Sequence, residues 1–239
     1  MAEELEYQDL SDAAFWDVSL RGATFRDVDL TGARISHSRL VDVVIDAEID
    51  RLVVNGVDVT AYVNERDEWF DLRSRVRPTE PGEMQRGWPA FVSAWAAAIE
   101  RARALPDERR HESVNGEWSF VQTLRHLLFA TDKWFTVPVL GSAFHPMGLS
   151  NSGSNDFPWP GIDPSAQPSV AEALAARADR AALVRDFLES VTIDDFSRSI
   201  DVLENGPHPL VECIYTVFEE PFWHNRYARR DLDVLRARQ

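Results

Sequence analysis

Hydrophobic side chains near the N-terminus recur at every fifth position. A large apolar residue fills each of seven such positions, and a smaller residue, usually Ala or Val, stands two places ahead of it; the large residues are Phe15, Leu20, Phe25, Leu30, Ile35, Leu40 and Ile45. Neither a helix, with about 3.6 residues per turn, nor a strand, with a repeat of about 2, has this period. The pattern favours a coil that turns one corner per repeat with the large residue inside. The alternative is a pair of irregular hairpins with an accidental period.

The repeat, a small residue followed by a polar one and then Leu or Phe, resembles the pentapeptide-repeat family. That resemblance implies a right-handed quadrilateral β-helix in which each repeat forms one side of the coil. Seven repeats complete fewer than two turns of such a coil. A stack this short leaves an open end unburied, so we expect it to dock on another surface.

The repeat ends at a hairpin signal that leads into a helical segment. Apolar and polar residues alternate around Asn55 and Gly56, a dipeptide typical of a tight turn between two strands. From Val59 the apolar spacing becomes helical, until the stretch "RVRPTEPGE" breaks it. We therefore expect a pentapeptide-repeat-like segment over residues 1–58, a linking helix over 59–78 and a helical bundle over 79–239.

Four longer segments have the apolar spacing of amphipathic helices. They cover residues 86–106, 117–141, 169–191 and a last stretch from near Pro209 to the C-terminus. In the second, Ser119 precedes Gln122 by three residues, the pattern of an N-terminal capping box. The side chains expected in the core are Trp88, Phe91, Val92, Trp95, Ile99, Phe120, Leu124, Leu127, Leu128, Trp134, Val170, Leu174, Val184 and Leu188. The predicted fold is mainly α: a four-helix bundle preceded by a short right-handed β-helix-like segment.

Residues 141–169 connect the second and third of these helices without any helical period. Loops this long in compact domains are usually functional or disordered. Large apolar side chains within it indicate packing against the bundle; they are Phe144, Met147, Leu149, Phe157 and Trp159. Our hypothesis is that this loop is a lid over a pocket.

Composition and charge exclude several classes of protein. With 44% hydrophobic and 27% charged residues, the chain has the make-up of a globular protein. A net charge of -15 repels nucleic acid and anionic membranes, and the arginines of residues 226–238 alternate with aspartates as on a solvated helix face. A single cysteine, Cys213, excludes an internal disulfide and fits a reducing compartment. The N-terminus is polar and no apolar run approaches the roughly 20 residues of a membrane span, so we expect a cytoplasmic location.

Three side chains are candidates for a metal site. Glu220 and His224 stand four residues apart in the last helix, a spacing that brings two ligand atoms toward one point, although such pairs also occur by chance. His126 lies among leucines in the second helix, where a histidine hydrogen-bonded in the core is the common alternative. Together, two histidines and a carboxylate with room for water would form an open, catalytic type of site.

Other residues that could bind a metal are weaker candidates. Three histidines lie in loops or charged connections and are expected at the surface: His111, His145 and His208. Cys213 is on the Glu220 side of the helix but about 10 Å away along it, so we expect a buried apolar role. Glu219 lies about 100° round the helix from Glu220 and is expected in the surroundings of the site or in solvent.

Motifs of the common hydrolases and nucleotide-binding proteins are missing from the sequence. It contains neither H-E-x-x-H nor G-x-S-x-G, and it has no glycine-rich phosphate loop. Protease, α/β-hydrolase and nucleotide-binding functions therefore have no support.

Two stretches carry a second resemblance. "GEWSFVQTLRHLLFATDKW" and "EEPFWHNRYARRDLDVL", joined by this kind of loop and third helix, resemble the DinB-like (DinB/YfiT) family, in its actinobacterial branch with a short pentapeptide segment in front. The resemblance covers about residues 53–236. It implies a four-helix bundle that holds a divalent metal, zinc or nickel, through three side chains, which fall here on His126, Glu220 and His224.

The same resemblance implies a function. Characterised relatives are similar to S-transferases or isomerases that use a low-molecular-weight thiol, mycothiol or bacillithiol, whose pKa the metal lowers. A small-molecule thiol and an electrophile are then the expected partners, and Arg226 or Arg230 could contact an acidic thiol, with surface ion pairing as the alternative. The competing hypothesis is a non-enzymatic metal-binding or stress-related interaction protein that docks through the pentapeptide segment. A homodimer is compatible with either.

Pro221 stands between the two candidate ligands of the last helix. A proline inside a helix leaves the carbonyl of Val217 without its helical partner and should bend the chain. Such a bend would change how Glu220 faces the ion.

Overall fold

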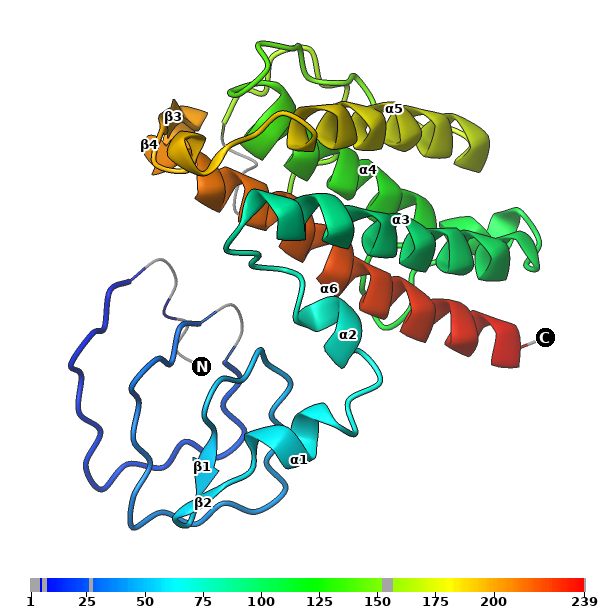
Figure 1. The fold of residues 1–239 in the computed structure, drawn as a ribbon. Helices are drawn as coiled ribbons and strands as arrows, with labels where there is room; N and C mark the ends of the chain where they lie inside the picture. The colour runs from blue at the N-terminus through cyan, green and yellow to red at the C-terminus, as the bar shows by residue number, and fades with distance from the viewer. Residues whose placement is uncertain (1–4, 6–7, 26–27, 152–156, 239) are drawn as a thin grey trace. The chain divides into compact units, whose positions relative to one another are not determined.

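A computed structural model gives the fold and describes residues 5, 8–25, 28–151 and 157–238. The chain forms two compact units, Met1–Asp46 and Ala47–Gln239. The first contains the five-residue repeats, and the second contains the helices and strands of the described residues (Figure 1).

The first unit turns a corner every five residues, as the repeat predicts. Residues with positive φ mark the corners: Asp12, Asp17, Gly22, Gly32, His37 and Asp42. Glycine adopts this conformation without a Cβ clash, and Asp and His are among the residues that tolerate it. Backbone hydrogen bonds close alternate corners, for example from Ala13 N to Leu10 O at 3.0 Å.

The repeat does not enclose the interior that the sequence led us to expect. Its seven large apolar side chains, from Phe15 to Ile45, are between 52% and 71% exposed. In a coil this short, each of these side chains has a neighbouring turn on one side at most, so it cannot be enclosed from both sides. The first unit therefore presents apolar surface of a kind that often marks an interaction site.

The second unit begins with the predicted hairpin. Strands β1 (Val53–Val54) and β2 (Val57–Asp58) pair antiparallel. Between them, Asn55 and Gly56 have φ values of 51° and 82°. Positive φ at both positions is what a two-residue type I′ turn requires, and Asn-Gly adopts it most readily.

The single linking helix predicted over 59–78 is wrong: the segment forms α1 (Thr60–Asn64) and α2 (Phe70–Arg73). Asp67 causes the break, because its side chain accepts the backbone N–H of Trp69 at 2.9 Å and also binds Arg73 Nε at 2.9 Å. An Asp that bonds its neighbouring backbone competes with a continuous helix. The domain boundaries at residues 58 and 78 stay a prediction.

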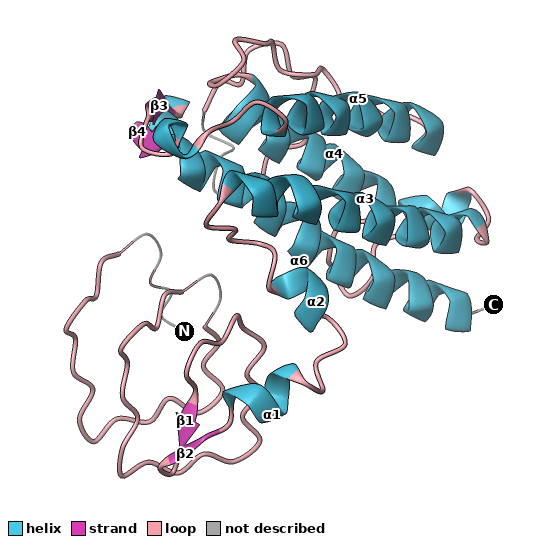
Figure 2. Cartoon of the chain, viewed as in Figure 1, coloured by secondary structure: helices cyan, strands magenta, loops and turns pink. Residues whose placement is uncertain are grey.

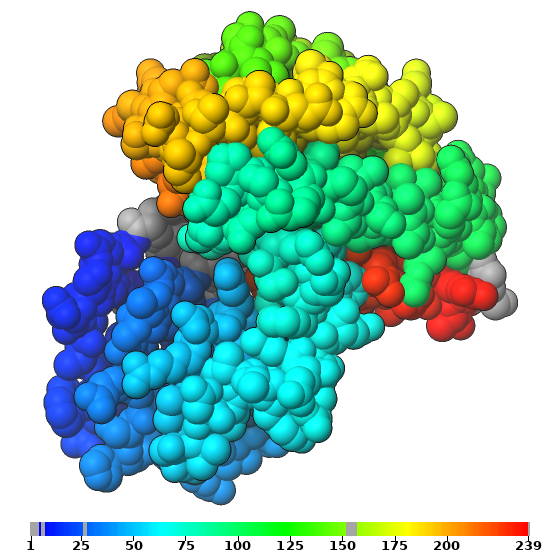
Figure 3. Space-filling model, viewed as in Figure 1, coloured from blue at the N-terminus to red at the C-terminus, as the bar shows by residue number. Residues whose placement is uncertain are grey.

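The four predicted long helices are present and form the bundle (Figure 2). They are α3 (Pro81–Arg103), α4 (Phe120–Thr131), α5 (Val170–Leu188) and α6 (Leu210–Ala237). Helix α6 packs against α3 and α4, and α5 packs against α4 and α3; Figure 3 shows α3 and α5 side by side. The capping box at Ser119 and Gln122 begins α4 as predicted.

Shorter elements complete the second unit. A π-helical turn, η2 (Asp132–Thr136), extends α4, and the connections that the structure describes contain three 3₁₀ turns: η1 (Glu108–His111), η4 (Ile193–Asp195) and η5 (Leu203–Asn205). Strands β3 (Ser199–Asp201) and β4 (Pro207–Pro209) pair antiparallel just before α6. Among the described helices, none is long and apolar enough to cross a bilayer.

Most of the predicted core side chains are buried between the four helices. Phe91, Leu124 and Leu188, for example, are each 1% exposed. Val92 is the clear exception at 48% exposed, because it lies at the edge of the apolar stripe of α3, on the solvent side. Large aromatic side chains fill the centre, and Phe91 and Trp88 both make edge contacts with Phe218 of α6.

Candidate metal centre

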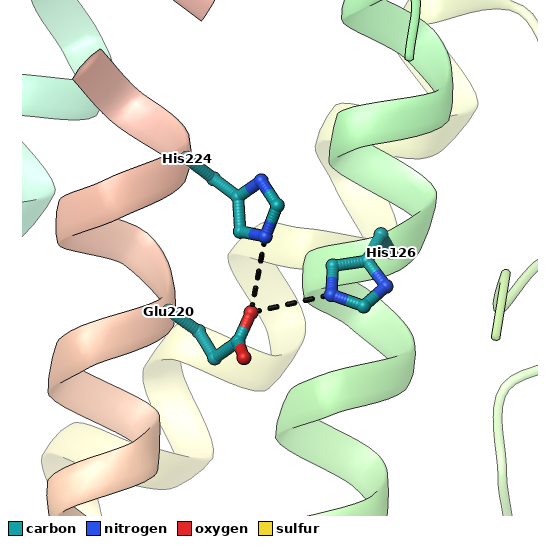
Figure 4. A group of neighbouring side chains, drawn as sticks. All are labelled: His126, Glu220 and His224. Carbon is teal, nitrogen blue, oxygen red and sulfur yellow. Dashed lines mark hydrogen bonds and ion pairs between the residues drawn. The ribbon is translucent and has the colours of Figure 1, made fainter. Parts of the chain in front are cut away.

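The three predicted ligands meet between α4 and α6. His126 lies two turns into α4, whereas Glu220 and His224 lie one turn apart on α6 and point at it (Figure 4). Each residue contributes one ligand atom, and the three atoms lie within 4.8 Å of one another. The packing of α6 against α4 thus turns two separate sequence signals into one cluster.

Glu220 is the centre of the cluster. Its Oε2 lies 3.2 Å from Nε2 of His126 and 3.2 Å from Nε2 of His224. Burial alone would raise the pKa of Glu220, but hydrogen bonds and positive charge from the two imidazoles outweigh it, so the pKa lies well below its ordinary value. The side chain of His126 is only 6% exposed and that of Glu220 is 31% exposed, so Glu220 is the more accessible of the two to solvent.

Aromatic rings surround the two imidazoles. The ring of Trp118 lies 4.3 Å from that of His126 and 5.9 Å from that of His224, between ring centroids. Phe129 packs near His126 at 6.2 Å, and Tyr227 meets His224 edge-on at 5.9 Å. The walls of the site are therefore largely apolar, while the ligand atoms are polar.

The donor set fits a divalent metal ion. Two imidazole nitrogens and one carboxylate oxygen are ligands that zinc and nickel accept, and three protein donors leave at least one position open. The distances of 3.2 Å between Glu220 and each histidine leave the three atoms close enough to converge on one ion. The acidity of Glu220 also fits, since a ligand must be deprotonated to bind.

Comparison with known protein families decides the relationship. Residues 90–228 match the DinB superfamily. The chain belongs to the DinB superfamily. A second match assigns eight pentapeptide repeats to residues 9–44, one more than the seven recognised from spacing, whereas no curated protein and no solved structure matches. All three candidate ligands of this DinB-superfamily chain lie within the matched region; the actinobacterial and mycothiol-dependent branch stays a prediction.

The residues ranked lower as ligands have other positions in the DinB bundle. Cys213 is fully buried in the hydrophobic core, and burial raises its pKa to about 11, so the thiol stays protonated. Glu219 forms an ion pair with Arg77 at 2.5 Å, away from the cluster, and burial raises its pKa despite this partner. The one cluster of three potential ligands that the described ranges contain is His126, Glu220 and His224.

The three histidines expected at the surface are also elsewhere. His111 is exposed in η1, and the ring of His208 packs edge-on against Trp134. His145 is half-buried in the loop, where its Nδ1 accepts the backbone N–H of Met147 at 3.2 Å.

The two arginines expected to contact a thiol differ in position. Arg230 Nε donates to Asp231 Oδ1 at 2.7 Å, and its guanidinium lies 5.4 Å from the ring centroid of Tyr227, whose ring faces an imidazole of the site. Arg226 lies against aromatic rings that include Trp223, 5.2 Å from its centroid. Arg230 is thus linked to the site through one aromatic ring; a cofactor role for either arginine stays a prediction.

Pro221 and Asn225 face α3 rather than the candidate metal. The indole N–H of Trp95 donates to the carbonyl of Pro221 at 2.9 Å, and Asn225 Nδ2 donates to the carbonyl of Ala94 at 3.0 Å. Both bonds tie α6 to α3, and α6 remains helical through Pro221. These two residues therefore fix the helix that carries Glu220 without entering the site.

Sequence reasoning missed two contributions to the site. Trp118, in the connection before α4, supplies its nearest aromatic wall. The backbone carbonyl of Leu149 lies 3.2 Å from Nδ1 of His126. The sequence shows that residue 118 is aromatic, but not that its ring lies beside His126. The position of a backbone carbonyl cannot be recognised from the sequence.

Proposed function

We propose that this DinB-superfamily protein binds a divalent ion, zinc or nickel, and catalyses transfer of a low-molecular-weight thiol, mycothiol or bacillithiol, to a small electrophile. The observation that supports it is the convergence of His126, Glu220 and His224 ligand atoms within 4.8 Å. A cytoplasmic location is part of the proposal, because small thiols stay reduced there.

The chemistry requires a thiolate and a reachable electrophile. When bound, the ion supplies positive charge that lowers the pKa of a thiol at its open position. The thiol loses its proton to water, and its sulfur then forms a bond to an electrophilic carbon, whose leaving group departs with the electrons of the broken bond. With an unsaturated acceptor, the proton instead returns to the neighbouring carbon.

The residues around the ligands suit these reactants. Trp118 and Phe129 offer apolar surface beside the imidazoles, which favours an electrophile with apolar parts. Arg230 is the better placed of the two arginines to meet an acidic group on the thiol, through its position at Tyr227. Cys213 has no part as a nucleophile, since burial keeps its thiol protonated.

Thiol consumption tests the proposal. Protein loaded with zinc is incubated with mycothiol or bacillithiol and a panel of electrophiles, and the remaining free thiol is measured. We expect the wild type to consume thiol and Glu220→Ala to consume none. His111→Ala, in which an exposed histidine is removed, is the control and should consume thiol as the wild type does. A zinc-loaded wild type that consumes no thiol with any electrophile would rule out the transferase.

A second candidate function rests on the first unit. Most of the large apolar side chains of its repeat are more than half exposed, Trp16 to 83% and Val44 to 89%. A protein that works by association, with a second copy of itself or with another protein, would use such a surface. This function predicts bound metal without thiol consumption, so the same experiment separates the two.

A further inference from the structure

The loop between α4 and α5 touches α4 at the candidate ligand itself. Leu149 N–H donates to the carbonyl of Arg125 at 3.2 Å, and Leu149 O lies 3.2 Å from Nδ1 of His126. One residue earlier on α4 than the ligand, the Arg125 Nε donates to the carbonyl of Met147 at 2.9 Å. Three hydrogen bonds therefore join two adjacent residues of α4 to residues 147–149.

The contact with Leu149 fixes which nitrogen of His126 is available. A carbonyl oxygen only accepts hydrogen bonds, so Nδ1 must carry the proton. The other nitrogen, Nε2, faces the Glu220 carboxylate at 3.2 Å and donates to it, so a bound metal would take the place of the Nε2 proton and leave the Nδ1 proton in its hydrogen bond to Leu149. Metal-binding histidines usually have such a second partner, which sets the tautomer and the direction of the ring.

We propose that residues 145–149 are a positioning element for His126, in which Leu149 orients the imidazole through its carbonyl and Arg125 is the positioning residue that holds the element on α4. This inference rests on the proposed metal site. It assigns the loop a role in metal affinity, in addition to any role in covering reactants.

Several contacts give this element a fixed conformation. His145 N–H donates to the buried Asp132 Oδ2 at 2.7 Å, and Asp163 N–H donates to the carbonyl of Pro146 at 2.8 Å. A Cβ added at Gly148 would lie only 3.3 Å from His145 O and from the Ile162 side chain, so the chain passes closely there.

Aromatic residues before and after residues 145–149 also pack against α4. Phe144 is 5% exposed and stacks near Phe129 of α4 at 6.1 Å, and Trp159 meets Phe129 edge-on at 4.8 Å. Since Phe129 also lies beside His126, the loop and the ligand share one packed neighbourhood.

Coupling between the loop and the metal follows, and it is reciprocal. If the ordered loop favours the metal-binding orientation of His126, bound metal must favour the ordered loop by the same free energy. Loss of the Arg125 anchor should weaken metal binding, and addition of metal should protect the loop.

Substitution of Arg125 tests the positioning role. Arg125→Met keeps the length and apolar stem of the side chain but donates nothing to Met147, whereas Arg125→Lys can still donate. Arg110→Met is the matched control, because Arg110 Nε also donates to a carbonyl at 2.9 Å, and its partner, Ala102, belongs to α3 and not to the loop. Zinc affinity is measured by competition with a chromophoric chelator, and the ligand field by the visible spectrum with cobalt.

We expect Arg125→Met to bind zinc about tenfold more weakly, in the range seen when a second partner of a metal-binding histidine is lost. The cobalt spectrum should change with it, Arg125→Lys should restore most of the affinity, and Arg110→Met should bind as the wild type does. Equal affinity and spectrum for wild type and Arg125→Met would overturn the positioning role while leaving the metal site intact. A wild type that binds neither ion would overturn both proposals.

A measurement on the wild type keeps the inference testable if Arg125→Met does not fold. The amide of Leu149 should exchange its hydrogen more slowly when zinc is added, because bound metal stabilises the loop. The same amide in Glu220→Ala should show little change on addition of zinc. Zinc binding to the wild type with unchanged exchange at Leu149 would contradict the coupling.

Discussion

At the scale of single residues, Glu220 shows how neighbours decide the chemistry of a side chain. Two imidazoles hydrogen-bond to the same carboxylate oxygen, and the resulting fall in the pKa of Glu220 exceeds the rise that burial alone would cause. The carboxylate consequently remains charged in mildly acidic solution and stays available to a cation.

Acid should release the metal through the histidines and not through Glu220. A proton competes with the metal for each imidazole nitrogen, so the affinity should fall as the solution is made more acidic. Zinc retained after dialysis at each pH measures this. Glu220→Gln should bind more weakly at every pH but keep the same dependence; a profile that the substitution flattens would contradict this assignment.

The candidate ligands were predictable to different degrees. The spacing of Glu220 and His224 placed them on one face of a helix, whereas a hydrogen-bonded core histidine was the more common interpretation of His126 until the DinB resemblance singled it out. The position of Trp118 and the carbonyl of Leu149 could not be predicted, because both depend on how the connections before and after α4 fold back on it.

At the scale of elements, the contact between α3 and α6 explains residues that looked out of place. A proline and a buried asparagine in α6 lie against α3, where Trp95 and Ala94 provide their hydrogen-bond partners. The asparagine is 0% exposed, so its bond to Ala94 replaces water that it cannot reach.

Removal of the indole donor should loosen this contact. Trp95→Phe keeps an aromatic ring in the core and loses the bond to Pro221, which should lower the free energy of unfolding by about 1 kcal/mol. Urea unfolding followed by circular dichroism gives the value. Trp16→Phe, at a position that is 83% exposed, is the control and should have little effect; equal stability of the wild type and Trp95→Phe would show that the bond contributes nothing.

Element prediction succeeded where a local signal is strong. Asn55-Gly56 and the Ser119 capping box each determine their own backbone, so the hairpin and the start of α4 were found. The linking helix failed because one side chain, Asp67, outweighed a helical apolar period. The π-helical turn at Asp132 was not predicted, since the hydrogen bonds of Asp132 with Arg180 and His145 connect residues far apart in the sequence.

At the scale of the whole molecule, the chain combines a repeat that exposes apolar side chains with a bundle that holds the candidate site. All three ligands belong to the second unit. The five-residue period predicted the corners of the first unit but not its exposed side chains, because the period carries no information about what covers a stack this short.

Removal of residues 1–46 should separate metal binding by the bundle from association through the repeat. We expect residues 47–239 to bind zinc with the affinity of the full chain, because the ligands and their hydrogen-bond partners are retained. If the repeat mediates a homodimer, light scattering should give about twice the monomer mass for the full chain. The shortened chain should give the mass of a monomer. Loss of zinc binding on truncation would show that the bundle depends on the repeat.

The metal content of the purified protein tests whether His126, Glu220 and His224 form a metal site. The full chain, purified with zinc and then dialysed, is analysed by mass spectrometry of its elements, together with His126→Ala and His111→Ala. We expect about one divalent ion per chain in the wild type and in His111→Ala, and almost none in His126→Ala. Equal metal in the wild type and His126→Ala, whether near zero or near one ion, would contradict the metal site.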